Sequence, residues 1–444
     1  MPPETIVQFA FQFDFFYLIT SFITTHFAMF SDLIEGTRRM RIAILHPSLT
    51  WRGGAERQVL NLAVELQRRK NEVEIFTTAI NSRCYPEHLK QLTIKVIRAP
   101  SPQREQFPMR RTVTSRLAGR FRSYTDDLPA MLYLGMKIPK GFDVINNHNF
   151  PTEWAAFFAK RKLNAPIVWM CNEPPFWFSE PAKRQGLGKI NLPLFEGLDK
   201  LAVKYIDEIV VLSSLAGLRV EKAYGRPSRI VRSGLNTDLL HRASGKDFRL
   251  KYGLENSFVL LQVGNIARDK RQKDSLIALQ YLSKKHDNVK LIFDGAGSTE
   301  ELIALSRKLG VEKKVLFLHS CSDEELAQVY AACDVFVFPA QITWGLAVIE
   351  AMATSKPVIV SRKCGASEII QNGQNGIVID EPNSENMVIQ VEKLIADSEL
   401  RKTIGVNARN YTVENLSWKI YAENMENIFK QTINNFRKKV YLQF

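Results

Sequence analysis

From residue 41 to the C-terminus, short apolar runs alternate with stretches in which apolar residues recur every three or four positions. Residues 42–45 form the first run, residues 47–54 are rich in turn-forming types, and residues 55–66 repeat apolar positions at helical spacing before the run at 73–77. Buried strands that alternate with amphipathic helices are typical of β-α-β units around a parallel sheet. The pattern therefore predicts an α/β fold.

These units fall into two series, and a chain of 444 residues is also too long for one hydrophobic core. Residues 234–254 separate the series. They are polar, contain glycine and show no sustained periodicity, so we place a domain boundary near residue 245. We predict two doubly wound, Rossmann-like domains over residues 40–245 and 246–416. The expected strands lie at residues 42–45, 73–77, 144–146, 167–170 and 208–212 in the first, and at 258–263, 289–293, 315–318, 335–338, 357–360 and 377–378 in the second.

The two ends of the chain are interpreted separately. Residues 417–444 place apolar side chains on one helical face and then become basic, which predicts a helix that either caps the second domain or crosses back to the first. Residues 15–30 are an uncharged apolar run that is shorter than the ~20 residues of a membrane-spanning helix. Residues 1–39 are therefore either a weak membrane-associated segment or, as we favour, the product of a mis-assigned start before Met40.

The composition indicates the cellular compartment of the protein and the charge of its partners. The five cysteines form no C-x-x-C pair, which argues against a zinc site and a disulfide framework and favours a reducing compartment, the cytoplasm. The net charge of +14 favours anionic partners. No Asp-x-Asp triplet occurs, so we expect no essential metal and no other cofactor.

The candidate chemistry lies where predicted strands give way to helices. Gly53 and Gly54 lie between the first strand and the first helix, where backbone can approach an anion, although an ordinary tight turn explains them almost as well. In the second domain, the residues after the first strand end in Lys270, at the mouth of the sheet where doubly wound folds bind ligands. A cation there can neutralise a diphosphate leaving group, unless the loop is simply a solvated basic turn. The residues of interest in this loop are Gly264, Asn265, Arg268 and Lys270.

Three later loops of the second domain add candidates of the same kind. Gly295 ends the second strand and is either a close-approach position or an ordinary turn. Gly345 and Leu346 open a helix whose first N–H groups can bind phosphate, and Glu350 follows within its first turns. The carboxylate of Glu350 can accept hydrogen bonds from the hydroxyls of a ribose. The alternative is that Glu350 is a plain surface or capping charge. Gly365 and Glu368 form a further pair of a glycine and a carboxylate.

Taken in order, these pieces resemble the retaining glycosyltransferases of family 4 over nearly the whole chain from Met40. The resemblance implies a GT-B fold, in which two Rossmann-like domains face a central cleft, a crossover C-terminal helix, and retaining transfer of a hexose-type sugar from a nucleoside-diphosphate sugar. The matching motifs are Gly-Gly-Ala-Glu-Arg at 53–57, the 264–270 loop, Gly345-Leu346 followed by Glu350-Ala351-Met352-Ala353, Pro357-Val358-Ile359, the 365–368 loop, and the glycines of 372–376.

The resemblance also implies roles for particular residues. Lys270, with Arg268, would neutralise the donor diphosphate, and Glu350 would hold the ribose. The remaining donor-binding residues would be Gly53, Gly54, Gly264, Asn265, Gly295, Gly345, Leu346 and Glu368. The acceptor-side residues would be His148, Asn172 and Glu173, although an isolated histidine after a strand is more often structural.

The chain departs from the family pattern at four positions, one of which is Asn236, where the family often has an aspartate. Ile342 stands where the family often has a glutamate that contacts the donor sugar, Asn265 where it has an arginine, and Asn172 where it has a histidine. These departures keep open a second hypothesis, a catalytically inactive GT-B protein that binds a nucleotide sugar or an anionic polymer.

The nature of the acceptor is indicated by one basic segment. Residues 102–122 hold six arginines against one glutamate, with apolar residues at helical spacing, so a helix here either lies on an anionic membrane or buries its apolar stripe against the first sheet. The first alternative favours a lipid-linked acceptor at the inner face of the membrane, and a polysaccharide acceptor stays open. Nucleic acid is not expected as a partner, because the basic residues lack interleaved aromatic platforms.

Overall fold

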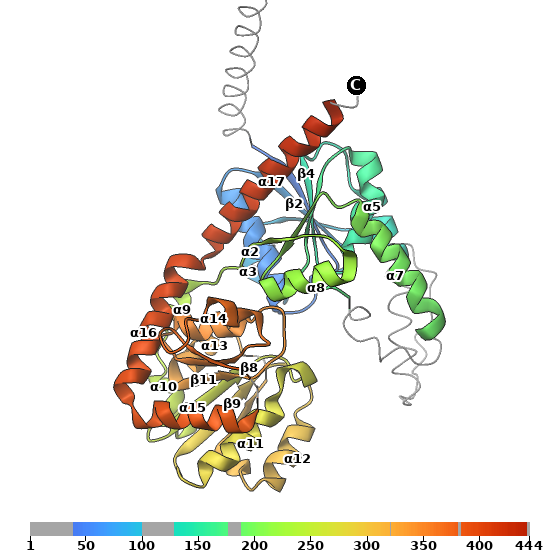
Figure 1. The fold of residues 1–444 in the computed structure, drawn as a ribbon. Helices are drawn as coiled ribbons and strands as arrows, with labels where there is room; N and C mark the ends of the chain where they lie inside the picture. Colours follow the sequence, from blue (N-terminus) through green and yellow to red (C-terminus); the bar gives the residue numbers. More distant parts are fainter. Residues whose placement is uncertain (1–38, 100–127, 176–187, 320, 381–382, 442–444) are drawn as a thin grey trace, which may run out of the picture.

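The computed structural model describes residues 39–99, 128–175, 188–319, 321–380 and 383–441, and it contains two α/β domains (Figure 1). The first holds a seven-stranded sheet of order β3-β2-β1-β4-β5-β6-β7, and the second a six-stranded sheet of order β10-β9-β8-β11-β12-β13. Neighbouring strands pair in parallel throughout both sheets. Both domains thus have the doubly wound, Rossmann-like architecture that the alternation of apolar runs and helices predicted.

The first domain is built from strands with buried centres and helices on both faces of the sheet. Its central strands β1, β4 and β5 are almost completely buried, because a parallel sheet covered on both faces has no solvent-exposed side. Its elements are β1 (Arg41–His46), α2 (Gly54–Arg68), β2 (Glu72–Thr77), α3 (Pro86–Leu89), β3 (Thr93–Val96), β4 (Val144–His148), α5 (Thr152–Leu163), β5 (Ile167–Met170), α7 (Gly188–Lys204), β6 (Glu208–Val211), α8 (Ser214–Tyr224) and β7 (Arg229–Ile230).

The second domain repeats the arrangement, with short 3-10 turns at several loops. Strands β8 and β11 lie at its centre and are buried. Its elements are α9 (Thr237–Arg242), α10 (Lys246–Tyr252), β8 (Phe258–Val263), η2 (Arg268–Lys270), α11 (Gln272–Ser283), β9 (Val289–Asp294), α12 (Glu300–Lys308), η3 (Glu312–Lys314), β10 (Val315–Leu318), α13 (Asp323–Ala332), β11 (Val335–Phe338), α14 (Leu346–Ala353), β12 (Val358–Ser361), η4 (Gly365–Ile369), β13 (Ile377–Ile379), α15 (Ser384–Ala396) and α16 (Ser398–Asn415).

Every strand predicted from an apolar run is present, with ends that differ by at most two residues. Two strands were missed, and both lie at edges of the first sheet. Strand β3 alternates exposed and half-buried positions, and β7 consists of two exposed residues. An edge strand that faces solvent needs no continuous apolar run, so hydrophobicity gave no signal.

Residues 234–254, the segment predicted to separate the two domains, are largely helical. Helices α9 and α10 occupy most of it, and Asn236 caps α9 by accepting a hydrogen bond from the backbone N–H of Leu239 at 3.2 Å. Each helix spans less than two full turns and buries one apolar side chain, Leu240 or Phe248. Such short helices cannot show a sustained 3.6-residue periodicity, which explains why the sequence pattern did not indicate them.

Helix α17 (Trp418–Tyr441) crosses from the second domain to the first and packs along α2 (Figure 1). Its buried face includes Tyr421, Met425 and Phe429. The carboxylate of Glu426 on the same helix pairs with Arg69 of the first domain. The crossover alternative is therefore confirmed, and the helix joins the two domains.

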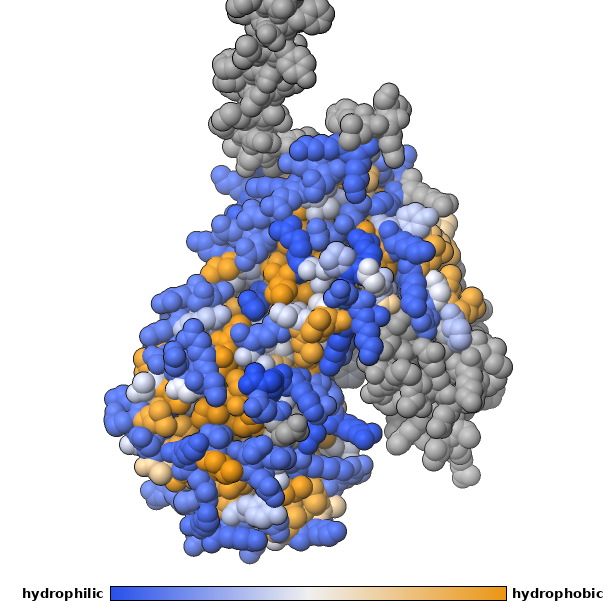
Figure 2. Space-filling view, viewed as in Figure 1, coloured by the Kyte–Doolittle hydropathy of each residue, from blue (hydrophilic) through white to orange (hydrophobic). Residues whose placement is uncertain are grey.

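Hydrophilic and hydrophobic residues are interspersed over the visible surface of both domains (Figure 2). Among the described residues, no helix is both long and apolar enough to cross a bilayer. The predicted features at residues 1–38 and in the basic segment 102–122 lie outside the described residues, so those interpretations stay predictions.

Candidate active site

The loops that follow β8 and β9 meet at the carboxyl end of the second sheet. Gly264 and Gly295 both have left-handed backbone, with φ of +149° and +151°. A Cβ atom on Gly295 would lie 2.2 Å from the carbonyl oxygen of Gly264, so only glycine permits this packing. A Cβ atom on Gly264 would lie 3.7 Å from Cδ of Lys270, which places the Lys270 side chain directly over the glycine turn.

Lys270 ends the 3-10 turn η2, and its charge is partly balanced by a neighbour. Its Nζ atom lies 2.7 Å from a carboxylate oxygen of Asp269. The carbonyl of Asp269 accepts a hydrogen bond from the backbone N–H of Gln341 at 2.8 Å, which ties the Lys270 loop to the loop that precedes α14. Arg268 and Asn265 are exposed in the same loop.

Helix α14 begins at Leu346 and presents Glu350 after one turn. A Cβ atom on Gly345 would lie 2.9 Å from Sγ of Cys364, so this glycine also allows close packing. Glu350 is buried, and its Oε2 accepts a hydrogen bond from the hydroxyl of Tyr330 at 2.9 Å. Burial raises the pKa of Glu350, and the positive charge of Arg57 acts in the opposite direction.

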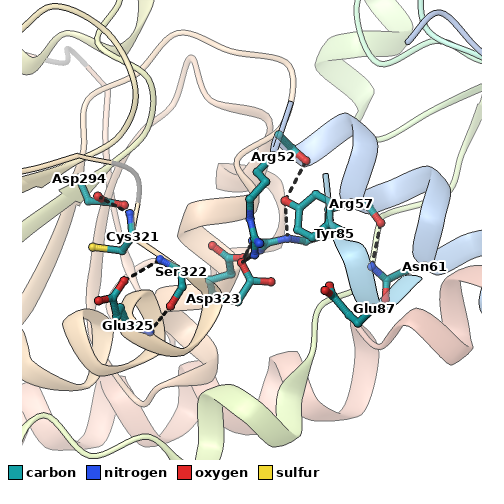
Figure 3. A network of polar contacts seen from close by, with 12 residues as sticks. Arg52, Arg57, Asn61, Tyr85, Glu87, Asp294, Cys321, Ser322, Asp323 and Glu325 are labelled. Carbon is teal, nitrogen blue, oxygen red and sulfur yellow. Dashed lines mark hydrogen bonds and ion pairs between the residues drawn. The ribbon is translucent and has the colours of Figure 1, made fainter. Parts of the chain in front are cut away.

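Arg57 reaches across from the first domain and was missed as a site residue by sequence reasoning (Figure 3). It lies in the first turn of helix α2, and its guanidinium pairs with Glu350 of α14 and, at 2.8 Å, with Asp323 of α13. Its Nε also donates to the hydroxyl of Tyr85 at 3.2 Å. The only signal in the sequence was the place of Arg57 in the motif at 53–57. That motif does not indicate that Arg57 pairs with Glu350, which lies 293 residues away.

A second contact between the domains uses Glu368, a predicted donor-binding residue. Its two carboxylate oxygens accept hydrogen bonds from the backbone N–H groups of Ser214 and Leu215, each at 2.9 Å. These N–H groups open helix α8 of the first domain, where a negative charge is favourable. Next to them, the hydroxyl of Ser213 donates to the carbonyl of Thr343. In this structure Glu368 therefore helps to hold the domains together.

The glycine loop of the first domain lies against the start of α14. A Cβ atom on Gly54 would lie 3.6 Å from a methyl carbon of Leu346, and Gly53 is the residue that precedes helix α2. Glu173 pairs with Arg219, and its pKa is raised by burial and lowered by the charges of Arg219 and Lys270. The fold thus brings Gly54 of the first domain against Leu346 of the second, and Glu173 of the first domain within reach of the charge of Lys270 of the second.

The other two acceptor-side candidates are placed differently. Asn172 follows β5 and donates from its amide to Oε1 of Gln58 at 2.8 Å. His148 ends β4 with no exposed surface, and its Nε2 lies 2.8 Å from Oδ1 of Asn146. Its ring is therefore a packed part of the first domain and is not brought to the cleft.

A hollow open to solvent lies between the domains, next to the Arg57 cluster. Glu350 lines it, together with residues of α2, α9, α13 and the start of α17, but Lys270 does not. Among the described residues, no group of three or more His, Cys, Asp or Glu side chains is arranged to hold a metal ion.

The burial of His148 predicts a loss of stability in acid. Burial, with a smaller effect of nearby His46, lowers the pKa of His148 to about 3, whereas an unfolded histidine titrates near pH 6.5. As the pH falls below 6.5, the unfolded chain takes up a proton that the folded chain refuses, so the free energy of unfolding decreases until about pH 3. The contribution of His148 at about pH 5 is a loss of about 2 kcal/mol relative to about pH 7.

Urea unfolding of the parent and of His148→Gln at both pH values checks this expectation. The variant should lose less stability on acidification than the parent, because glutamine has no proton to gain. Buried Glu153 and Asp199, whose pKa values burial raises, act in the opposite direction in both proteins and cancel in the comparison. Equal losses in parent and variant would show that His148 is protonated in the folded state.

Comparison with known proteins places this geometry in a family. The model described as "Glycosyltransferase Family 4" matches residues 52–239, and that described as "Glycosyl transferases group 1" matches residues 246–411. The alpha-1,3/1,6-mannosyltransferase ALG2 of Dictyostelium discoideum is 23% identical over 90% of this chain and 100% of its own length. The capsular polysaccharide biosynthesis glycosyltransferase CapM of Staphylococcus aureus is 32% identical over 42% of this chain and 48% of its own length.

A solved structure supports the same fold. HepE of Anabaena, crystallised with UDP-glucose, superposes with a TM-score of 0.70 over 88% of this chain and 100% of that one, at 19% identity. The two parallel-sheet domains and the two family models matched one after the other along the chain indicate the same fold as this structure. The chain belongs to the family 4-type glycosyltransferases of the GT-B fold.

Proposed function

We propose that this glycosyltransferase takes a hexose from a nucleoside-diphosphate sugar bound at the carboxyl end of the second sheet. The observation that carries the proposal is the position of Lys270 over the glycine turn, in a loop that a backbone hydrogen bond ties to the loop before α14, the helix that carries the buried carboxylate of Glu350. A cation and free helix N–H groups suit a diphosphate. A carboxylate can accept hydrogen bonds from ribose hydroxyls. Glu350 has ~4 acceptor positions, so it can accept these bonds while it still contacts Arg57 and Tyr330. The UDP-glucose bound to HepE supports a donor of this class.

The proposed transfer retains the anomeric configuration. The acceptor hydroxyl attacks the anomeric carbon from the face that the diphosphate leaves, and its proton passes to a diphosphate oxygen. Lys270 stabilises the charge that grows on the diphosphate. Two carboxylates near Lys270 are already held in ion pairs, Asp269 with Lys270 and Glu173 with Arg219, so we assign no protein nucleophile. NMR of the product distinguishes retention from inversion, and an inverted product would overturn this part.

The experiment that tests the donor is a release assay for nucleoside diphosphate, with the purified chain and a panel of UDP-, GDP- and ADP-sugars. Slow release from one donor is expected, since water can replace the acceptor. Tight nucleotide binding without release from any donor would instead favour the inactive binding protein. The observation behind that second candidate is Ile342, whose half-buried side chain packs against the core where the family often has a carboxylate.

We expect the reaction to need no metal ion, because Lys270 supplies the positive charge at the diphosphate. Release measured with EDTA present should equal release measured without it. Activity that EDTA abolishes and Mg²⁺ or Mn²⁺ restores would contradict this expectation.

The proposed acceptor is a lipid-linked sugar or a growing polysaccharide at the cytoplasmic face of a membrane. The net charge of +14 supports contact with an anionic surface, and the name of the CapM relative supports a polysaccharide. Radiolabelled donor incubated with a membrane fraction tests both, because a lipid-linked product enters organic solvent and a polysaccharide does not. Co-sedimentation with phosphatidylglycerol vesicles, but not with phosphatidylcholine vesicles, would support the membrane location.

A further inference from the structure

A chain of hydrogen bonds runs from the crossover helix α17 to the loop after β5 of the first domain. Tyr421, in the first turn of α17, is fully buried and accepts a hydrogen bond from Nε2 of Gln58 at 2.9 Å. Gln58, in α2 and also buried, accepts one from Nδ2 of Asn172 at 2.8 Å. Both polar atoms of the Gln58 side chain are thus used, and they connect residues that lie 114 and 363 positions away from it in the sequence.

The last member of this chain has one polar atom left over. Oδ1 of Asn172 is buried and has no hydrogen-bond partner among the described residues. A buried acceptor without a donor costs about 1–3 kcal/mol, so such atoms call for an explanation. A ligand hydroxyl that donates to this oxygen would remove the cost.

The position of Asn172 indicates which ligand supplies that hydroxyl. Asn172 lies two residues after the end of β5, at the carboxyl end of the first sheet, and is followed by Glu173. The charges of Lys270 and Asp269, both in the second domain, act on the pKa of Glu173. A sugar attached to a diphosphate at Lys270 would therefore lie near the loop of the first domain that holds Asn172 and Glu173.

We propose that Gln58, held by Tyr421 of the crossover helix, is a positioning residue that turns the Asn172 carboxamide so that its Oδ1 accepts a hydrogen bond from a hydroxyl of the transferred sugar. The inference rests on the proposed donor. It assigns a second task to α17: besides joining the domains, the helix sets the orientation of a sugar-contacting amide in the other domain.

Substitutions at Gln58 and Tyr421 can break or preserve the chain of hydrogen bonds. Gln58→Leu removes both bonds, and Tyr421→Phe removes only the partner that fixes Gln58. Gln58→Glu preserves the chain, because a carboxyl group at this position accepts from Asn172 and bonds the Tyr421 hydroxyl. Glu426→Gln is the matched control: it weakens the pairing of α17 with Arg69 and leaves Gln58 untouched.

The measurements are kcat and KM for nucleoside-diphosphate release from the best donor of the panel, and the Kd of the corresponding free nucleoside diphosphate. Gln58→Leu and Tyr421→Phe are expected to raise KM about tenfold, the equivalent of one hydrogen bond of about 1.4 kcal/mol. The Kd of the nucleoside diphosphate, which has no sugar, should stay at the parent value. Gln58→Glu should restore the parent KM, and Glu426→Gln should keep it while lowering Tm.

Each other result counts against the proposal. An unchanged KM in Gln58→Leu would overturn the positioning role. A parallel loss of nucleoside-diphosphate affinity, or the same rise in KM in Glu426→Gln, would show that only the docking of α17 matters. If the parent releases nothing from any donor, the proposed function fails first and this inference falls with it, an outcome that the parent alone reveals.

Discussion

Lys270→Ala is expected to lower the rate of nucleoside-diphosphate release by about 10²–10³, the effect of removing one preorganised charge from a developing anion. The loss should fall mainly on kcat, because the charge on the diphosphate grows as the sugar-phosphate bond breaks. The proposed role follows from the position of the Lys270 side chain over the Gly264 turn, which packs against Gly295. Asp269, its partner at 2.7 Å, holds the ammonium in place in the absence of donor.

The matched control for this substitution is Lys273→Ala. Lys273 lies three residues further on, carries the same charge and pairs with Glu301 on the exposed surface of the second domain. It should keep the parent rate, because its charge is screened by solvent and lies outside the cleft. A rate for Lys270→Ala within the range of this control would remove Lys270 from the proposed mechanism.

Arg57→Met is expected to lower the free energy of unfolding by about 3–5 kcal/mol, because it leaves the buried carboxylate of Glu350 without its charge partner. The loss of the Arg57 charge costs less at Asp323, since this carboxylate is half-buried and also pairs with Arg52 at 3.1 Å. The effect should be largest for unfolding that separates the domains, because Arg57 belongs to one domain and its carboxylate partners to the other.

The same substitution has a pH dependence of known sign. Burial raises the pKa of Glu350 above its unfolded value, and without Arg57 the pKa rises further. A carboxyl with a raised folded pKa costs stability above the unfolded pKa, and the cost disappears as the pH falls through the folded pKa. The deficit of Arg57→Met should therefore shrink in mild acid.

Urea unfolding of four proteins measures this coupling: the parent, Arg57→Met, Glu350→Gln and the double variant. The double variant should regain much of the stability that Arg57→Met loses, since a neutral amide needs no cation. Additive losses in the double variant would show that Arg57 and Glu350 do not depend on each other. Because both residues also border the proposed ribose site, nucleotide affinity should be measured on the same proteins.

Local sequence was sufficient to identify the parts of the candidate site that are built from one continuous loop. The loop from Gly264 to Lys270 was predicted because its glycine, its cation and its place after a buried strand are all visible within seven residues. The same holds for Gly345, Leu346 and Glu350 at the start of one helix. Burial of parallel strands on both faces leaves a long apolar run in the sequence, so the central sheets were also predictable.

Contacts between distant residues were decided only by the tertiary structure. Nothing near Arg57 indicates that it pairs with Glu350, and nothing near Asn172 indicates that Gln58 and Tyr421 orient it, because each pair comes together only after two domains and the crossover helix have packed. Glu368 was predicted to bind donor from a local motif, yet its oxygens meet the start of α8. His148 follows a strand as a ligand-binding residue would, but packing removes its ring from solvent. The amino-acid sequence by itself thus determined the two α/β domains and the loops that end their strands, since both follow from local periodicity and turn chemistry. The tertiary structure alone decided which side chains face the cleft and which hold it together, since these depend on the relative placement of residues hundreds of positions apart.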